Sequence, residues 1–345
     1  MKILHCIFKI MQQIIFAFLV LTMIYASASA EQQIIEADGS YTIGDGLDEN
    51  ISVAKDRAKA EALRNAGEQA SVYVDSLTIV QEGMLTKDEI KVISSNIMQV
   101  QGEPKYKIIP VSDDVIRYQC HVTVLVDTDN INAALLQDKA SLADAVQRNK
   151  ELEGEVERLN REMEALKQKY SQASTDMERQ ELQQEARRND DGFIAAQWNE
   201  KGAILYGEGH YTEAIDAFNR AIEKNPDFAY AYHNRGTAYG KLKEYGSAIS
   251  DFSRAIALDG TYATAYGGRG FAYYGLGDYE HAAADFSRAI TLNPSYVEAY
   301  YGRGNVYMNF QHYEEALRDY ERALALNPQL DAARTNRDMI LNAMK

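Results

Sequence analysis

The chain of 345 residues is long enough for two or three domains and carries a formal net charge of −15. This acidity argues against a basic stripe of the kind that binds nucleic acid, so no nucleic-acid partner is expected. Its two cysteines, Cys6 and Cys120, cannot supply a disulfide framework. The composition is otherwise that of an ordinary folded protein, with 46% hydrophobic residues.

Residues 1–30 have the pattern of a secretory signal peptide. Lys2 and Lys9 form a charged start, residues 14–25 an apolar core, and Ala-Ser-Ala at residues 28–30 a cleavage site. Loss of the two lysines with the leader would change the net charge to −17. The alternative is an uncleaved membrane anchor, because the apolar stretch approaches the length of a span. In both cases we expect an exported protein, periplasmic or extracellular, at the cell envelope.

Residues 31–129 are predicted to form a small α+β domain. A strand over 34–43, interrupted or bulged at Asp38-Gly39, is followed by a helix over 51–76. Alanines recur at every fourth position of this helix and should let it lie close against a sheet. They are Ala54, Ala58, Ala62, Ala66 and Ala70.

A second helix and a hairpin complete the predicted α+β domain. Thr86 and Glu89 form a capping box for a helix that runs to about Met98. Strands over 105–111 and 116–126 follow, and the second one alternates apolar and polar side chains. The alternation places Cys120 on the apolar side, so we interpret it as a small buried residue and not as a reactive thiol.

The layout of residues 31–129 resembles small bacterial envelope domains. The resemblance is carried by Ala37-Asp38-Gly39 and the alanine-rich run that follows. It is similar to the N-terminal domain of the flagellar assembly protein T and to LPP20-type lipoprotein domains. The resemblance implies a possible association with the envelope and no particular activity.

Residues 130–191 are predicted to form a coiled coil with a flanking linker. Apolar residues alternate by three and four, with Leu at d positions and Val156 at an a position, which is typical of a parallel homodimer. The proposed dimerisation residues are Leu142, Asn149, Leu152, Val156, Leu159, Met163 and Leu166. A trimer is left open, and the alternative to both is a charged helix that packs on its own chain. The scarcity of apolar residues over 172–191 predicts a frayed extension or hinge.

Residues 195–330 repeat one pattern four times with a period of 34. In the third copy it reads Tyr266, Gly270, Tyr273, Tyr279, Ala282, Phe286, Ala289 and Pro294. The copies span 195–228, 229–262, 263–296 and 297–330, and residues 331–345 have the pattern of a capping helix. The pattern resembles the tetratricopeptide repeat (TPR), which implies an all-α solenoid of four helix pairs. The predicted fold is therefore multidomain: a small α+β domain, a long coiled-coil helix and a TPR solenoid.

The repeated residues have clear packing roles. Gly and Ala at facing positions should let the two helices of a copy approach closely, while the large aromatic residues fill the space between copies. Asn-Pro pairs end the second helix in three copies. The second copy has Asp259-Gly260 instead, and we expect its turn to be kept because Gly also ends helices well.

The candidate binding surface lies on the first helix of each copy. The TPR resemblance implies that positions 2, 5, 9, 12 and 13 of this helix line a concave face. The candidates are Asn199, Tyr206, Tyr230, His233, Lys241, Phe271, Tyr274, Tyr301, Asn305, Met308 and Asn309. Aromatic and amide side chains suit an extended peptide or a partner helix. The two-carboxylate clamp of some relatives is not supported, since only Asn305 matches it. The alternative is that some of these aromatic residues simply pack between copies.

Charged residues also repeat in the second helix of each copy. Asp-x-x-Arg units occur as Asp251/Arg254, Asp285/Arg288 and Asp319/Arg322, and we interpret them most simply as solvated pairs within one helix. Arginines beside the repeated Gly, namely Arg235, Arg269 and Arg303, could instead reach these acids across the helix pair and hold it together.

No catalytic motif is present in the sequence. It has neither a phosphate-binding loop nor a His-Glu-x-x-His motif, and its six histidines show no ligand spacing, so no metal or cofactor is expected. We predict an exported, non-enzymatic adaptor that binds a protein or peptide in the repeat groove and is paired by the coiled coil. The alternative function is structural, in envelope assembly, with residues 31–129 as the active part.

Overall fold

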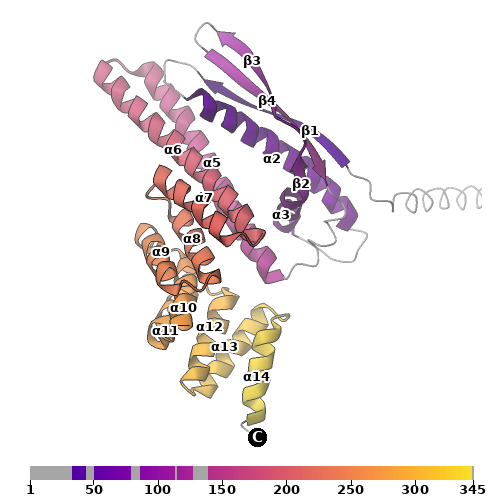
Figure 1. The fold of residues 1–345 in the computed structure, drawn as a ribbon, viewed down its shortest axis with the longest axis vertical. Helices are drawn as coiled ribbons and strands as arrows, with labels where there is room; N and C mark the ends of the chain where they lie inside the picture. Colours follow the sequence, from indigo (N-terminus) through magenta and orange to yellow (C-terminus); the bar gives the residue numbers. More distant parts are fainter. Residues whose placement is uncertain (1–32, 44–49, 79–85, 113–114, 127–138, 344–345) are drawn as a thin grey trace, which may run out of the picture. The chain divides into compact units, whose positions relative to one another are not determined.

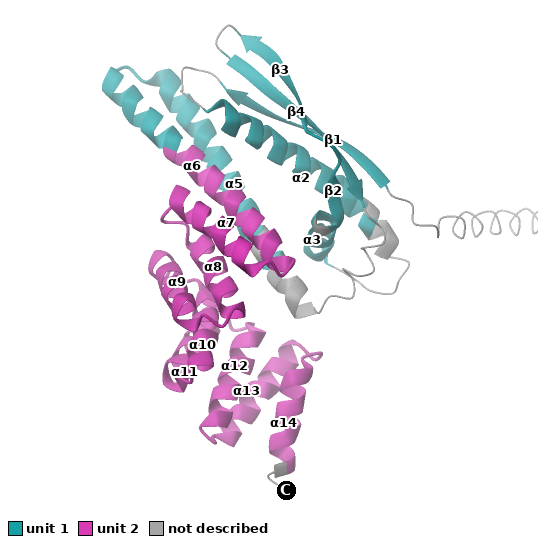
Figure 2. Ribbon diagram, viewed as in Figure 1, with its two compact units in different colours: residues 1–187 teal, residues 188–345 magenta. Residues whose placement is uncertain are grey.

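The computed structural model of the chain describes residues 33–43, 50–78, 86–112, 115–126 and 139–343. The leader lies outside these residues. Among the described helices, none combines the length and the apolar character needed to cross a membrane. The chain divides into two compact units, residues 1–187 and 188–345 (Figure 2).

An antiparallel sheet forms the base of the first unit. Its strands are β1 (Gln33–Ile43), β2 (Met98–Val100), β3 (Lys105–Ser112) and β4 (Val115–Val126) (Figure 1). β4 is central: β1 pairs along one side, and β2 and β3 share the other. Every second residue of β4 from Tyr118 to Val126 is buried, which confirms the predicted alternation and the burial of Cys120. The small α+β domain is therefore present.

Helix α2 (Ile51–Thr78) lies very close to β1 because small residues meet there. All five alanines of the predicted row are buried, with at most 1% of their surface exposed. At Gly39, a Cβ atom would lie 2.2 Å from the backbone nitrogen of Ala62 and 2.4 Å from the carbonyl oxygen of Ala58. β1 keeps an unbroken register with β4, so the predicted interruption at Asp38-Gly39 is wrong. Gly39 makes room for the helix and does not break the strand.

Helix α3 (Lys87–Ile97) packs on α2 and begins as predicted. The Thr86 hydroxyl accepts a hydrogen bond from the backbone N–H of Glu89 (3.2 Å). The Glu89 carboxylate accepts one from the N–H of Thr86 (2.6 Å). This capping box satisfies two N–H groups that the first turn of a helix leaves free. The apolar side of α3 then closes the core of the α+β domain, where Ile93 is fully buried.

Two long helices follow, α5 (Lys139–Gln172) and α6 (Asp176–Gly207). Met163 and Leu166 of α5 form a buried cluster with Leu182 and Ala186 of α6. Residues 176–191 are thus part of a regular helix, and a frayed extension there is wrong, whereas the predicted stretch does contain a break between the two helices at residues 173–175. Leu182 and Ala186 are one helical turn apart on the buried side of α6, while Met177 is exposed, so the many charged and amide residues around them conceal the pattern in the sequence.

A second stripe of α5 faces the α+β domain. It consists of four residues at intervals of seven, each directly after a d position of the heptads: Val146, Glu153, Asn160 and Lys167. Val146 packs against the core of the sheet domain. Glu153 accepts a hydrogen bond from Lys91 Nζ (2.6 Å), and Asn160 accepts one from the Arg57 guanidinium. A stripe with a period of seven therefore joins α5 to its own chain.

Lys167 makes the most buried contact of this stripe. Its ammonium group donates to the carbonyl oxygen of Thr42 (2.5 Å) and lies 4.3 Å from the centre of the Tyr41 ring. Only 8% of the side chain is exposed. A buried ammonium group needs such partners, because an unpaired charge is costly away from water.

These contacts bear on the predicted parallel dimer. Leu159, Met163 and Leu166 are at least 90% buried within the single chain. The second stripe of α5 also contacts residues of the same chain. The side chains of Leu142 and Asn149 lie outside the described ones. Dimerisation is not shown, and the contacts favour the alternative that the heptads left open, a charged helix that packs on its own chain.

The second unit is built from helix pairs. After the C-terminal part of α6, its helices are α7 (Tyr211–Lys224), α8 (Ala229–Lys241), α9 (Tyr245–Leu258), α10 (Ala263–Leu276), α11 (Tyr279–Leu292), α12 (Val297–Asn309), α13 (Tyr313–Leu326) and α14 (Asp331–Ala343). Each predicted copy holds two of them, and α14 is the predicted capping helix. The solenoid of four helix pairs is therefore confirmed.

Glycine allows close packing inside each pair, as the sequence predicts. A Cβ atom at Gly270 would lie 2.9 Å from the Phe286 ring, and one at Gly304 would lie 2.7 Å from the Tyr320 ring. The turn of the second copy is also kept: the Asp259 carboxylate accepts from the N–H of Thr261 (2.8 Å). Asn293 does the same for Ser295 (3.1 Å) in the third copy.

Candidate binding surface

The first helices of successive copies contact one another. α8 contacts α10, and α10 contacts α12. In the described residues no comparable contact joins the second helices α9, α11 and α13 to each other. The array is thus tighter on the side of its first helices, which makes this side its inner layer. We refer to the five predicted positions of each first helix as the inner face.

The structure places all the predicted binding residues on first helices. Asn199 and Tyr206 are on α6, and Phe271 and Tyr274 are on α10. The others lie on α8 (Tyr230, His233 and Lys241) and on α12 (Tyr301, Asn305, Met308 and Asn309). They differ, however, in how much of each side chain solvent can reach.

Some predicted residues serve packing between copies, as the alternative interpretation allows. Asn199 is only 4% exposed, and its side-chain oxygen accepts a hydrogen bond from the Asn234 amide (3.0 Å). The His233 ring lies 4.9 Å from the Tyr262 ring, and the Tyr230 ring lies 5.3 Å from it. Asn199 thus joins the first copy to the second, whereas His233 and Tyr230 pack against the last residue of their own copy, so a ligand has limited access to all three.

Other predicted residues are open to solvent. The Phe271 ring is 37% exposed and meets Phe286 edge-on at 4.8 Å. Lys241 and Asn309 are exposed, and the Asn309 amide donates to the Tyr274 hydroxyl (3.1 Å), which links α12 to α10. Phe271 with Tyr274 and Asn309 thus offers an aromatic and amide surface in the middle of the array.

A buried polar network closes the last copy. The Tyr320 hydroxyl donates to the side-chain oxygen of Asn305 (2.8 Å), which also accepts from the Asn336 amide (3.0 Å). Tyr320 stands where the earlier copies have Phe, and it is fully buried, which raises the pKa of its hydroxyl. Sequence reasoning missed Asn336, although the period of 34 continues into the capping helix and could have located it.

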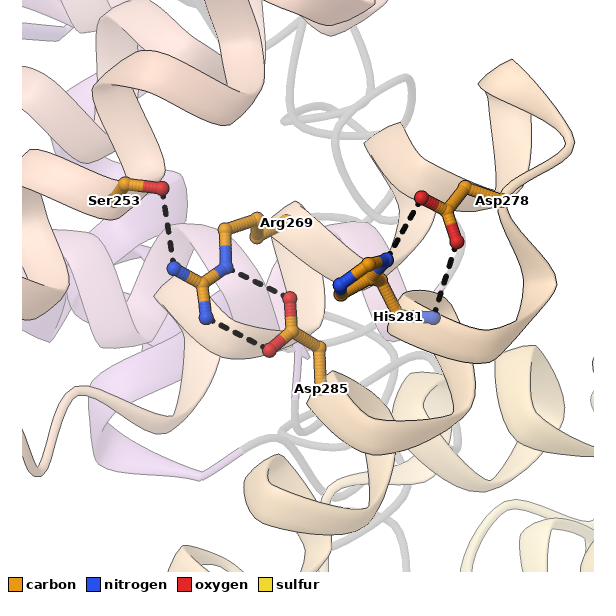
Figure 3. A network of polar contacts seen from close by, with 5 residues as sticks. All are labelled: Ser253, Arg269, Asp278, His281 and Asp285. Atoms are coloured by element: carbon orange, nitrogen blue, oxygen red, sulfur yellow. Dashed lines mark hydrogen bonds and ion pairs between the residues drawn. The ribbon is translucent and has the colours of Figure 1, made fainter.

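The repeated arginines clamp the helix pairs. Figure 3 shows Arg269 of α10 donating from Nε and Nη2 to both oxygens of Asp285 on α11, at 2.8 and 2.9 Å. Its Nη1 donates to the Ser253 hydroxyl of the preceding copy (3.1 Å). The hydrogen bonds with Asp285 raise the pKa of Arg269. One guanidinium thus joins three helices and two copies.

The same clamp recurs with the period of the repeat. Arg235 binds Asp251 at 2.8 and 2.6 Å, and Arg303 binds Asp319 at 2.8 Å through both contacts. The simpler prediction, solvated Asp-x-x-Arg pairs within one helix, is wrong because these carboxylates are buried and face the other helix. The cross-helix alternative is confirmed. The spacing of 16 residues between Arg and Asp is the sequence signal for it.

The clamp arginines and arginines of the second helices also stack on aromatic rings. Arg235 and Arg254 lie 5.5 and 5.8 Å from the Tyr232 ring, and the same arrangement recurs at Tyr266 and Tyr300. Arg254 also pairs with Asp227 (3.1 Å). None of these arginines is at an inner-face position, and their repetition indicates a role in stability.

Asp278 caps the start of α11. Its carboxylate accepts from the backbone N–H of His281 (3.3 Å) and pairs with His281 Nδ1 at 2.8 Å (Figure 3). The hydrogen bond with the His281 ring lowers the pKa of Asp278. In the described residues no group of three or more His, Cys, Asp or Glu side chains could hold a metal ion.

Comparison with known families agrees with this geometry. Family models described as TPR repeat match residues 202–243 and 272–309, and those described as tetratricopeptide repeat match 229–262 and 297–330. This part of the chain consists of tetratricopeptide repeats. The last two ranges coincide with the second and fourth predicted copies. These matches lie within residues 202–330, and the resemblance of residues 31–129 to the flagellar and LPP20-type domains stays a prediction.

Several solved structures are similar to the TPR part. A crystal structure of MamA protein is 24% identical over 44% of this chain and 82% of that chain (TM-score 0.40). The first TPR of Spaghetti (RPAP3), bound to the HSP90 peptide SRMEEVD, is 32% identical over 35% and 95% (TM-score 0.34). The Arabidopsis OM64 TPR domain is 29% identical over 32% and 93% (TM-score 0.32). Among curated proteins, none matches the chain.

Proposed function

We propose that the TPR array is a non-enzymatic adaptor that binds an extended segment or a helix of a partner protein along its inner face. The observation that carries this is the exposed Phe271 ring, with Tyr274 and Asn309 beside it. An exposed aromatic ring surrounded by amide groups is typical of the centre of a protein interface. The clamps and stacked arginines keep the helices fixed, so the surface is formed before a partner arrives.

Export is part of the same proposal. The charged start, apolar core and Ala-Ser-Ala site of residues 1–30 support secretion, and the acidic charge suits a soluble exported protein. N-terminal sequencing of the protein from its native host tests this. A mature chain that begins at Glu31 supports export with cleavage, and a chain that still begins at Met1 in the cytosol contradicts it.

Pairing of two chains would add bivalent binding, as the heptads predict. The buried positions of Met163 and Leu166 within one chain count against this addition. The adaptor function does not need it, because one array already presents the whole inner face. We therefore propose binding by a single chain.

Photo-crosslinking tests where a partner binds. A photoreactive phenylalanine analogue replaces Phe271 in the full chain, in the native host, and crosslinked products are identified after irradiation. We expect one dominant adduct. The matched control carries the analogue at Ile204, which is 57% exposed on α6 at a position whose counterparts in the other copies are buried. Equal crosslinking from both positions, or none from Phe271, would contradict binding at the inner face.

A further inference from the structure

The capping helix α14 continues the inner face. Ala333 of α14 corresponds through the period of 34 to Ala299 and Ala265, and all three are fully buried. Ile340 corresponds in the same way to Val306, and both are buried. α14 therefore occupies the place of a first helix in the register of the repeat. Its side chains at inner-face positions lie in line with those of α10 and α12.

Position 9 of the first helices then forms one row of side chains. Phe271, Asn305 and Met339 follow one another at intervals of 34 residues. Phe271 is 37% exposed and Met339 is 53% exposed. Asn305 between them is held by Tyr320 and Asn336, so its position is fixed. The row thus offers two exposed apolar groups on either side of an ordered amide.

The inner face carries almost no charge. Its five positions on five helices, α14 included, hold two charged residues, Lys241 and Glu298, where the chain's 25% average would place about six. These two have opposite sign, so the face is close to neutral. The remaining charges of the unit lie on other faces, including the clamps. Depletion of charge around exposed aromatic and methionine side chains is characteristic of the core of a binding surface.

We propose that the inner face binds an uncharged segment of a partner protein, whose apolar side chains cover Phe271 and Met339. The proposal rests on the adaptor function and specifies its ligand. An acidic segment is disfavoured because Lys241 is the one cation among the inner-face positions, and a desolvated carboxylate without a cation is costly. Methionine at the second contact suits varied apolar side chains, because its side chain is flexible and polarisable.

A peptide selection on the full chain tests this. Random dodecapeptides displayed on phage are selected against the immobilised protein, and the enriched peptides are synthesised for fluorescence polarisation. We expect enriched sequences with at least two apolar residues and no excess of Asp or Glu. Their affinity should change by less than about twofold between about 50 and 500 mM salt, because no ion pair forms. The acidic peptide SRMEEVD serves as the charged probe and should not bind.

Matched variants locate the contacts. Phe271→Ser and Met339→Ser should each weaken binding of the enriched peptides about tenfold or more, as central interface residues do. Leu341→Ser is the control: Leu341 is 41% exposed on the same helix, outside the inner-face positions, and its replacement should leave affinity unchanged. Thermal unfolding of each variant verifies that it is folded.

The outcomes separate this inference from the adaptor function. Enrichment of acidic peptides, or binding of SRMEEVD that Lys241→Ala abolishes, overturns the uncharged ligand and leaves peptide binding intact. Enriched peptides that bind Met339→Ser normally overturn the role of the capping helix. If the wild-type chain enriches no more peptides than the Phe271→Ser/Met339→Ser variant, both the adaptor function and this inference fail.

Discussion

Arginine and aspartate occur as matched partners in the clamps. Asp251, Asp285 and Asp319 are each about 95% buried, and each meets a guanidinium through two hydrogen bonds. In the first copy the corresponding positions hold Lys201 and Ala217, so arginine and aspartate are absent together. This joint absence has a physical reason. A buried carboxylate without its cation is more costly than the absence of both groups.

Replacing one partner of a clamp should therefore harm the array more than replacing both. We expect Arg269→Ala to lower the free energy of unfolding by about 3 kcal/mol, because Asp285 is left buried and unpaired. The double variant Arg269→Ala/Asp285→Ala should recover at least half of this loss. Urea unfolding followed by circular dichroism measures both. A double variant that is less stable than Arg269→Ala would show that the clamp itself, not relief of an unpaired charge, dominates.

Backbone strain is present at one turn position of the repeat. The turn between the two helices of a copy has a positive φ at Gly209, Lys243, Gly277 and Gln311, with φ values between 61° and 85°. Glycine adopts this conformation without cost, whereas other residues lose about 1 kcal/mol or more. Two of the four copies therefore carry avoidable strain.

Glycine at the strained turns should stabilise the array. We expect Gln311→Gly to raise the free energy of unfolding by about 0.5–1 kcal/mol, since the strain there exceeds the extra freedom glycine gains on unfolding. The reverse change, Gly277→Gln, should cost a similar amount, and a Cβ at Gly277 meets no atom within 4 Å, so backbone strain is its main effect. Thermal melts of the two variants decide this. A Gln311→Gly variant with a melting temperature below that of the wild type would contradict the presence of backbone strain at this position.

At the scale of elements, the closeness of α2 and β1 depends on one residue. Gly39→Ala would place a Cβ atom within 2.4 Å of two backbone atoms of α2, so the helix must move away from the sheet. We expect a loss of about 3 kcal/mol, typical of severe overpacking. Gly67→Ala is the control inside α2, where a Cβ meets only the flexible end of Met98 at 3.5 Å. It should be neutral or stabilising, because Ala favours helix. An equal loss of stability in both variants would show that the close approach of α2 to β1 at Gly39 does not limit which residue is tolerated there.

The elements that could be predicted are those with a strong local pattern. The four copies, the capping box at Thr86 and the alternation of β4 depend on neighbouring residues, so one sequence reveals them. Two errors have a common cause. The apparent break at Gly39 and the apparent Asp285/Arg288 pair were both interpreted within one element. In the structure, Gly39 is required by the close approach of helix α2, and Asp285 pairs with Arg269 of helix α10.

The candidate surface could be predicted only in part. The register places Phe271, Asn199 and His233 alike on the inner face, but of the three only Phe271 is exposed. Asn199 bonds Asn234 of the next copy, and His233 packs against Tyr262 at the end of its own copy. Exposure depends on the neighbouring side chain, such as Tyr262, which the register does not specify. Met339 was missed because the capping helix lacks the aromatic and glycine residues that mark the other copies.

At the scale of the whole molecule, the boundary between units lies inside a helix. The sequence suggests separate segments at 130–191 and 192–330, whereas the compact units meet at residues 187 and 188 within α6. α5 and the start of α6 belong with the sheet domain through Val146, Glu153 and Lys167. The heptad pattern is real, but an amphipathic helix shows the same spacing whether its partner is another chain or its own.

The state of association distinguishes these two partners. We expect one chain per particle, because a parallel pair would have to separate Met163 and Leu166 from α6 and expose the buried Lys167. Analytical ultracentrifugation over a wide concentration range measures the mass, and the melting temperature should not depend on concentration, as it does for obligate dimers. Met163→Asp provides the internal test: in a self-packed chain it lowers the melting temperature without changing the mass. A particle of two chains that Met163→Asp converts to one would show that the heptads pair between molecules after all.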